Sequence, residues 1–265
     1  VTGIDLVREQ LRIAAGEPLG YGQEDVLFTG HAIEARLYAE DPDNGFLPAI
    51  GNVDAFTRAV EPVVRWDSGI EQGSVVGVDF DPMLAKVIAH GPTRSEAAGR
   101  LALALERLHL GGVVTNRDFL AATLRNSAFL AGDTTTDFIE RVAPVDAPHC
   151  GTGRMRAAVL GALWIQGINH AATRLGERNV GSLPSGWRNT LMPDERVVLA
   201  HRATGEEIEV RYRVGRDGSF VVTAQDGDPT RAIVHRWSET EIDVEIDGMR
   251  SISTVTKRVD RLHVQ

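Results

Sequence analysis

The chain has 265 residues, of which 43% are hydrophobic and 25% are charged, as in an ordinary globular protein with one or two domains. Its net charge of −9 excludes a nucleic-acid partner, because phosphate binding needs clustered Lys and Arg side chains that this sequence lacks. No apolar run approaches the roughly 20 residues of a membrane span and no signal peptide is recognisable, so we expect no membrane partner and a cytoplasmic location.

The first predicted element is a short amphipathic helix that begins within the first five residues. Thr2 and Asp5 have the spacing of a capping box, in which Thr2 caps the helix. Apolar residues then recur at the spacing of a single helical face up to Ala14.

Short strands follow this helix. From residue 33 to 38 apolar and polar residues alternate, which predicts a strand with one buried face. Two more short strands are expected between residues 52 and 67, and others around 74–78 and 83–89. Arg65 is the only cation in the apolar run of residues 63–66, so it is a candidate for a functional role.

Helices are expected to follow these strands. Thr93 and Glu96 form a capping box before apolar residues at helical spacing up to Leu108. Thr115 or Asn116 caps the next helix, and a short helix is expected near residues 137–142. Helices on one face of a mostly antiparallel sheet predict an α+β layer.

Residues 143–153 are rich in Pro and Gly and indicate a domain boundary. Cys150, the single cysteine, lies in this segment and is interpreted as structural or incidental. A helix over about residues 154–174 is apolar around much of its girth and therefore needs burial on several sides. About seven short strands follow, enough for a barrel or sandwich that holds the helix.

Several ordered segments carry a resemblance to a known family. Over roughly the first 140 residues the chain resembles the C-terminal subdomain of biotin carboxylase, as found in the biotin-bearing alpha subunits of acyl-CoA carboxylases. GHAIEAR and TTDFI are more similar to the 3-methylcrotonyl-CoA carboxylase branch than to the propionyl-CoA branch. The segments that carry the resemblance are GHAIEARLYAEDP, FLPAIG, VRWDSG, DFDPMLAK, GVVTNRDFL and GDTTTDFIE.

The resemblance implies a domain order. Residues 1–23 are expected to end an ATP-grasp region, and residues 24–143 to form the biotin carboxylase C-terminal subdomain, an antiparallel sheet with helices. Residues 144–265 resemble the BT domain, an antiparallel β-barrel with one long hydrophobic helix, which docks on the carboxyltransferase beta subunit. LPSGWRN, at residues 183–189, is the recognisable segment of that domain.

The resemblance also implies a reaction, the carboxylation of biotin with ATP and bicarbonate. ATP, magnesium and biotin are the cofactors of such a parent enzyme, and its other partner is the biotin carboxyl carrier domain. The Lys and Glu residues that the family uses for ATP, magnesium and proton transfer have no counterpart here, nor does the carrier's Met-Lys-Met site. We therefore expect this chain alone to bind none of these cofactors and to be inactive.

Other functions stay open at this stage. The chain could serve an acetyl-CoA or propionyl-CoA carboxylase instead of a methylcrotonyl-CoA carboxylase. It could also be a self-sufficient ATP-dependent ligase of another type, or a non-catalytic interaction module. Binding and turnover of ATP with magnesium would favour the self-sufficient ligase.

Two candidate site residues follow from the resemblance. In the family, the Arg of VRWDSG, here Arg65, reaches the place where bicarbonate meets the biotin ureido ring and suits stabilisation of an enolate-like oxygen. From the residue pattern alone, the favoured reading of Arg65 is a pair with Asp67 or another surface carboxylate, and the resemblance reverses this preference. Thr136 matches a family position at the edge of the adenine pocket, and helix capping before Asp137 is the alternative.

The remaining candidates concern metals and partners. Glu71, Asp79 and Asp81 lie across turns without a His or Cys partner, and the eight His residues are scattered, so no metal site is predicted. Trp187 and Arg188 are candidate docking residues for the beta subunit, because Trp and Arg are frequent in interface hot spots. A Trp packed into the end of the barrel is the alternative.

Overall fold

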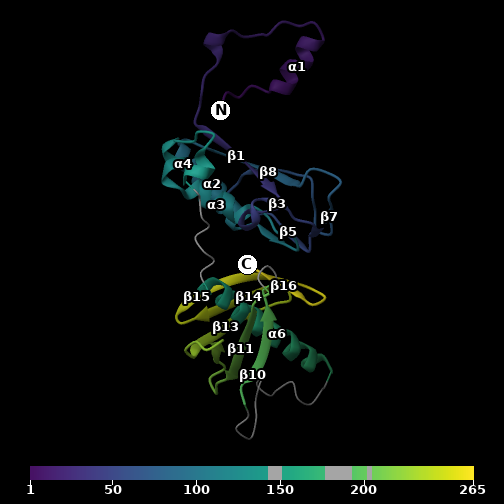
Figure 1. Ribbon diagram of the computed structural model, residues 1–265, viewed down its shortest axis with the longest axis vertical. Helices are drawn as coiled ribbons and strands as arrows, with labels where there is room; N and C mark the ends of the chain where they lie inside the picture. The colour runs from purple at the N-terminus through teal and green to yellow at the C-terminus, as the bar shows by residue number, and fades with distance from the viewer. Residues whose placement is uncertain (143–150, 177–192, 202–204) are drawn as a thin grey trace. The chain divides into compact units, whose positions relative to one another are not determined.

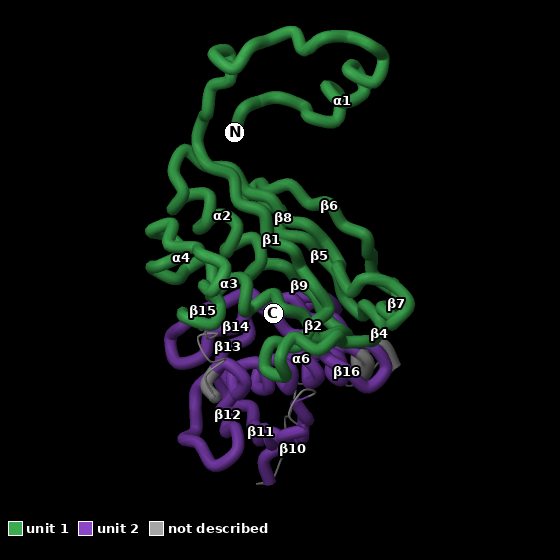
Figure 2. The backbone as a smooth tube through the Cα atoms, turned by 45° about the horizontal axis from the view of Figure 1, so that its top comes forward, with its two compact units in different colours: residues 1–146 green, residues 147–265 purple. Residues whose placement is uncertain are grey.

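The computed structural model describes residues 1–142, 151–176, 193–201 and 205–265 (Figure 1). The chain divides into two compact units, Val1–Asp146 and Ala147–Gln265, which we call unit 1 and unit 2 (Figure 2). Antiparallel strands joined with a smaller number of helices make up both units. The expected α+β class is therefore confirmed.

Unit 1 combines small antiparallel sheets with five α-helices among its described residues. Its helices are α1 (Leu6–Ala14), α2 (Arg94–Glu106), α3 (Arg117–Arg125), α4 (Ser127–Ala131) and α5 (Phe138–Val142). Its strands are β1 (His31–Tyr38), β2 (Glu40–Asp41), β3 (Leu47–Pro48), β4 (Gly51–Asn52), β5 (Ala55–Thr57), β6 (Arg65–Ser68), β7 (Val75–Val76), β8 (Met83–Gly91) and β9 (His109–Gly111). The main sheet has the order β1-β8-β6, and the other strands pair in twos as β2-β3, β4-β7 and β5-β9.

The central strand β8 separates a buried face of the main sheet from an open one. On the buried face, Val87 and Ala89 pack with Leu101 and Leu105 of α2 and with Ala35 of β1. Figure 1 shows α2 and α3 beside β1 and β8. Successive side chains of a strand point to opposite faces, so the alternate residues of β1 and β8 face away from these helices.

The N-cap of α2 is the residue predicted from the sequence, whereas the N-cap of α1 is a different one. Thr93 caps α2 as predicted, since its hydroxyl oxygen accepts a hydrogen bond from the backbone N–H of Glu96 at 3.2 Å. The prediction that Thr2 caps the first helix is wrong. Asp5 is the N-cap of α1, and its carboxylate accepts from the N–H of Arg8 at 3.0 Å. Asp5 directly precedes the first helical residue, the position from which a short side chain reaches the unpaired N–H groups.

Asn116 lies at the predicted start of α3, but its side chain does not cap that helix. The Oδ1 atom accepts from the N–H of Tyr38 at 2.9 Å, and Nδ2 donates to the carbonyl of Arg36 at 3.3 Å. The backbone N–H of Asn116 also donates to the carbonyl of Tyr38 at 3.2 Å. Asn116 is only 6% exposed, so it satisfies the free edge of β1 and joins α3 to the sheet.

Unit 2 is a curled antiparallel sheet around one long helix. The helix is α6 (Gly151–Gly176), and no described helix is long and apolar enough to cross a membrane. The seven strands expected from the sequence are present in the described residues, in chain order across one sheet. They are β10 (Glu195–Ala200), β11 (Glu207–Val214), β12 (Phe220–Ala224), β13 (Thr230–Trp237), β14 (Glu241–Ile246), β15 (Met249–Arg258) and β16 (Arg261–Val264).

Two tryptophans hold α6 against the sheet by reciprocal hydrogen bonds. The indole N–H of Trp164, a residue only 1% exposed, donates to the carbonyl of Ser238 at 3.0 Å. The indole N–H of Trp237 donates to the carbonyl of Trp164 at 3.1 Å, and the centroids of the two rings lie 6.4 Å apart. Buried indole N–H groups need such partners, so each ring both fills the core and fixes the helix. The expected burial of the apolar helix within the strands is confirmed.

Gly167 makes this arrangement possible, because a Cβ atom there would clash with Nε1 of Trp237. We predict that Gly167→Ala lowers the free energy of unfolding of unit 2 by about 1–3 kcal/mol, the usual cost of overpacking a core. Gly153→Ala is the matched control, since nothing lies within 4 Å of a Cβ at Gly153 in the same helix. Urea unfolding followed by tryptophan fluorescence measures both, and equal midpoints for the two variants would contradict the close contact.

Candidate functional site

The open face of the β1-β8-β6 sheet carries alternating charges. Its side chains come from the residues of each strand that point away from α2, and they are exposed or half-buried. We call this surface the charged face; it consists of Glu34, Arg36, Arg65, Asp67 and Lys86.

The strand register arranges these residues in two adjacent rows. Glu34, Ile88 and Arg65 form one row, because Ile88 of β8 is opposite both of the others. Arg36, Lys86 and Asp67 form the next row in the same way. Directly opposite side chains in antiparallel strands have Cβ atoms about 5 Å apart. Lys86 is thus the central residue of a row that has another cation on one side and a carboxylate on the other.

Arg65 and Asp67 form a two-bond ion pair along β6. The Arg65 Nε donates to one carboxylate oxygen of Asp67 at 3.0 Å, and Nη2 lies 2.8 Å from the other. The hydrogen bond with Asp67 and its charge, with a weaker contribution from Glu34, raise the pKa of the Arg65 guanidinium. The Arg65 side chain is 74% exposed, so its Nη1 donors face solvent. The surface pairing that the sequence left open is therefore present, and it leaves the outer edge of the guanidinium accessible.

Lys86 differs from the two arginines of the charged face in its ion pairing. Arg36 pairs with Glu34 at 3.1 Å, and Arg65 pairs with Asp67. No carboxylate lies within 4.0 Å of the Lys86 ammonium among the residues that the structure describes. This lysine was not among the candidate residues that the sequence indicated, although the alternation in residues 83–89 places it on the polar side of its strand.

A hollow of about 380 Å³ adjoins this lysine. It lies where β6 meets the start of β8, and both Lys86 and Asp67 contribute to its wall. Its lining residues are Asp67, Ser68, Gly69, Met83, Leu84, Ala85 and Lys86.

Carboxylates near the beginning of β8 do not make a metal site. Burial raises the pKa of the Glu40 carboxyl, and repulsion by Asp81 adds to this shift. Within the described ranges of the chain, no group of three or more His, Cys, Asp or Glu side chains could hold a metal ion. These residues therefore do not fit the magnesium ion that the resemblance implies.

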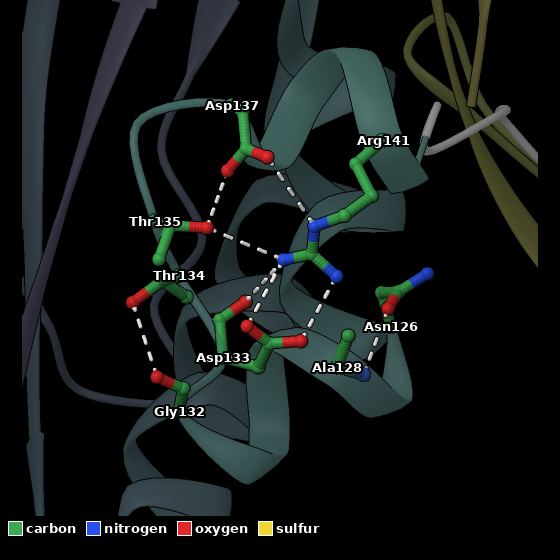
Figure 3. A network of polar contacts seen from close by, with 8 residues as sticks. All are labelled: Asn126, Ala128, Gly132, Asp133, Thr134, Thr135, Asp137 and Arg141. Carbon is green, nitrogen blue, oxygen red and sulfur yellow. Dashed lines mark hydrogen bonds and ion pairs between the residues drawn. The ribbon is translucent and has the colours of Figure 1, made fainter.

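Thr136 lies between α4 and α5, and its two sequence neighbours Thr135 and Asp137 belong to the polar network that Figure 3 shows. Arg141 is the centre of this network and pairs with both carboxylate oxygens of Asp133, at 2.9 and 3.0 Å. The hydroxyl of Thr135 donates to Asp137, whose carboxylate lies 3.7 Å from Arg141. The hydroxyl that contacts Asp137 is therefore that of Thr135.

The sequence-predicted site residues do not meet in one cluster. Arg65 lies on β6 and Thr136 follows α4, and no hydrogen bond or ion pair joins the two in the described structure. The proposed docking residues Trp187 and Arg188 lie outside the described residues, as does Cys150.

Two family models match the chain in the order of its two units. Residues 34–141 match the biotin carboxylase C-terminal domain, and residues 155–265 match the BT domain of the methylcrotonyl-CoA carboxylase alpha subunit. The first match contains the whole charged face, and the second contains every described strand of the seven-stranded sheet.

The similar proteins and solved structures include carboxylase alpha subunits and biotin carboxylases. The chain is 33% identical to the mitochondrial methylcrotonoyl-CoA carboxylase subunit alpha of Arabidopsis thaliana, over 94% of this chain and 37% of that protein. It is 32% identical to the propionyl-CoA carboxylase alpha chain of Ruegeria pomeroyi, over 97% of this chain and 40% of that protein. The chain thus spans about two fifths of the length of these relatives.

The similar solved structures match about half of the chain. The biotin carboxylase domain of the 2-oxoglutarate carboxylase of Hydrogenobacter thermophilus, in complex with MgADP and bicarbonate, has a TM-score of 0.51 at 36% identity. The biotin carboxylase subunit of a pyruvate carboxylase has the same TM-score at 39% identity. Both matches cover 54% of this chain and 32% of the other chain.

The polar network of Figure 3 allows a prediction about the pKa of Asp137. The hydrogen bond from Thr135 is the largest cause that lowers the pKa of the Asp137 carboxyl, ahead of a backbone hydrogen bond and Arg141. Thr135→Val removes the donor to the charged form, so the pKa of Asp137 should rise towards its ordinary value of about 3.9. Thr134→Val is the control, because the Thr134 hydroxyl bonds to the carbonyl of Gly132. Carbon-13 NMR titration of the carboxyl groups measures the shift, and an unchanged pKa in Thr135→Val would show that the bond does not form.

Proposed function

Since the chain belongs to the alpha subunits of biotin-dependent carboxylases, we propose that it takes part in the ATP- and bicarbonate-dependent carboxylation of biotin. In this proposal unit 1 contributes side chains to the carboxylation site and unit 2 docks on a carboxyltransferase beta subunit. The observation that carries the proposal is the exposed guanidinium of Arg65, held by Asp67 on the charged face.

The chemistry of the charged face supports this role. Biotin, when bound, supplies the ureido group that accepts the carboxyl group. Arg65 keeps donors free for an oxygen that gains negative charge, and Asp67 fixes the plane of the guanidinium before any ligand arrives. Donors that are oriented in advance stabilise developing charge without reorganisation at the moment of reaction.

We further propose the methylcrotonyl-CoA branch, with a propionyl-CoA or acetyl-CoA carboxylase as the alternative. The BT model that matches residues 155–265 is that of a methylcrotonyl-CoA carboxylase, and this supports the choice. The similar identities of the methylcrotonoyl-CoA and propionyl-CoA relatives keep the alternative open. The biotin carboxyl carrier domain is the third partner in this proposal.

A second proposal concerns the chain by itself. Since the Lys and Glu residues that the family uses for ATP, magnesium and proton transfer have no counterpart in this sequence, we expect residues 1–265 alone to bind no ATP with magnesium and to have no turnover. Calorimetric titration with ATP and magnesium checks this expectation. Binding with turnover would favour a self-sufficient ligase, and a folded chain that neither binds ATP nor captures a beta subunit would favour a different interaction module.

The role of Arg65 predicts a selective kinetic defect. In an alpha subunit that contains residues 1–265, Arg65→Ala should lower the rate of biotin carboxylation by about 100- to 1000-fold, the cost of losing one donor to developing charge. The KM for ATP should stay nearly unchanged, because the guanidinium meets the reacting group and not the nucleotide. An unchanged carboxylation rate would remove Arg65 from the site.

The docking role predicts that variants in unit 2 lose binding of the beta subunit and keep carboxylation. Residues 1–265 should capture the cognate carboxyltransferase beta subunit in a pull-down, and Trp187→Ala combined with Arg188→Ala should weaken capture, because large buried anchors carry most interface energy. The two variants are controls for each other. In an alpha subunit that contains residues 1–265, Arg65→Ala should still bind the beta subunit, and the double variant should still carboxylate biotin.

Each outcome of the pull-down decides one claim. A folded wild-type chain that captures no beta subunit contradicts the docking role. Capture by the double variant that equals wild type keeps the docking role but moves the contact away from Trp187 and Arg188. Circular dichroism of each variant verifies that it is folded.

A further inference from the structure

A hollow of about 360 Å³ in unit 1 has walls from β1 and from the helices α3, α4 and α5. We call it the aromatic hollow, because Phe46, Phe119 and Phe129 contribute to its wall. Neither Arg65 nor Thr136 lines it, so it is separate from both candidate residues that the sequence indicated in this unit. Mostly apolar hollows of this size with a few polar groups are typical of small-molecule sites. The lining residues are Ile33, Glu34, Ala35, Arg36, Tyr38, Glu40, Phe46, Asn116, Phe119, Leu120, Thr123, Leu124, Phe129 and Ile139.

Two of the aromatic rings are held against each other. Phe46 has a φ of 61°, in the left-handed region where a bulky non-glycine residue is uncommon. Its ring meets that of Phe119 edge to face, with the ring centroids 5.0 Å apart and the ring planes at 82°. This is a preferred arrangement of aromatic pairs. The two rings therefore give the hollow a fixed apolar wall.

A hydroxyl group in the wall of the hollow has no partner. The Oγ1 atom of Thr123 is buried, and among the described residues it is the only such side-chain oxygen or nitrogen without a hydrogen bond. A threonine in a helix commonly bonds the carbonyl four residues earlier, which here would be that of Phe119. A buried hydroxyl without a partner is costly, so a polar ligand group that reached it would be stabilised.

A carboxylate in the same wall is also unpaired. Glu40 is half-buried, and its carboxylate has no hydrogen bond or ion pair within the part of the chain that the structure describes. Burial and then repulsion by Asp81 raise its pKa, and no cation offsets them. The other two charges of the wall, Glu34 and Arg36, pair with each other at 3.1 Å. The unbalanced charge of the hollow is therefore negative, and a cation would relieve it.

We propose that the aromatic hollow binds a small organic cation, an ammonium ion with an aromatic or branched apolar body. The ammonium group donates to the Glu40 carboxylate, and the apolar body lies against Phe46 and Phe119. The hydroxyl of Thr123 accepts a further proton of the ammonium group. Aromatic faces near a cation add electrostatic attraction. This site needs none of the carboxylation chemistry and goes beyond the proposed function.

The first test compares two probes on residues 1–265. Benzylamine is protonated at neutral pH, and benzyl alcohol is a neutral compound with the same ring. In NMR titrations at fixed ionic strength, benzylamine should bind at least about tenfold more tightly, because only the cation forms a charge-assisted hydrogen bond with Glu40. Intermolecular NOEs from the benzylamine methylene group to the rings of Phe46 and Phe119 should locate it in the hollow.

The second test removes each polar group of the site. Glu40→Gln keeps the shape of the side chain, and it should weaken benzylamine at least about tenfold while benzyl alcohol binds as before. Glu71→Gln is the matched control, since it removes an exposed carboxylate outside the hollow and changes the net charge equally. Thr123→Val should weaken benzylamine by about two- to tenfold, the size of one hydrogen bond. Circular dichroism verifies the fold of each variant.

Three results would overturn the site. The first is equal affinity of the two probes for the wild-type chain, which decides the question even if Glu40→Gln does not fold. The second is an equal loss of benzylamine affinity in Glu40→Gln and Glu71→Gln, since a chain with a net charge of −9 attracts any cation. The third is a set of NOEs to residues outside the hollow. Arg65→Ala should keep the wild-type affinity for benzylamine, so failure of the proposed carboxylation role leaves this site untouched.

Discussion

Unit 1 depends on the alternation of strand β8 between an apolar and a charged side. The strand is hydrogen-bonded to β1 on one edge and to β6 on the other, so its pleat sets which side chains of both neighbours face outwards. Burial of Val87 and its neighbours against α2 stabilises the fold, at about 1.5–3 kcal/mol for each fully buried large aliphatic side chain. A slip of one residue would expose this apolar set and bury the charges. The same constraint that forms the core therefore presents the charged face to solvent.

The ion pairs of the charged face orient the arginine side chains and contribute little to the stability of the fold. Arg65, Arg36 and their carboxylate partners are exposed, and solvent screening leaves such pairs little influence on folding. What the pair of Arg65 and Asp67 does is hold a guanidinium in one plane on a rigid strand. Asn116 adds to this rigidity from the other edge, since its side chain bonds β1 at Arg36 and Tyr38. Functional side chains on supported strands keep their geometry better than those on loops.

In unit 2 the main constraint is the burial of a helix that is apolar on several sides. The curled sheet surrounds α6, and the exchange of hydrogen bonds between Trp164, Trp237 and Ser238 satisfies both indole N–H groups inside the core. Ala162, Leu163 and Trp164 are buried by these contacts and are unavailable to another protein. A partner of this unit therefore has to contact the outer surface of the sheet or the connecting segments.

The sequence by itself determined the local elements and the family. Alternation over residues 33–38 predicted β1, the pair of Thr93 and Glu96 predicted the start of α2, and the ordered segments from GHAIEARLYAEDP to GDTTTDFIE indicated biotin carboxylase. Each of these signals is contained in a short stretch of neighbouring residues, so it is readable without the fold. The sequence also indicated Arg65 as a candidate, together with its possible partner Asp67 two residues away.

Only the tertiary structure decided which distant side chains meet. Lys86 lies between Arg36 and Asp67 because two separate strands pair with β8 in one register, and no local pattern specifies that register. Asn116 was one of two expected caps of α3, with Thr115, yet its side chain bonds a strand about 80 residues earlier in the chain. A hydrogen-bonding side chain takes the partner that packing brings within reach, and burial of the apolar faces of α2 and β8 sets that packing. The pattern of each segment is thus encoded locally, whereas the contacts that make a site arise from how the segments are packed.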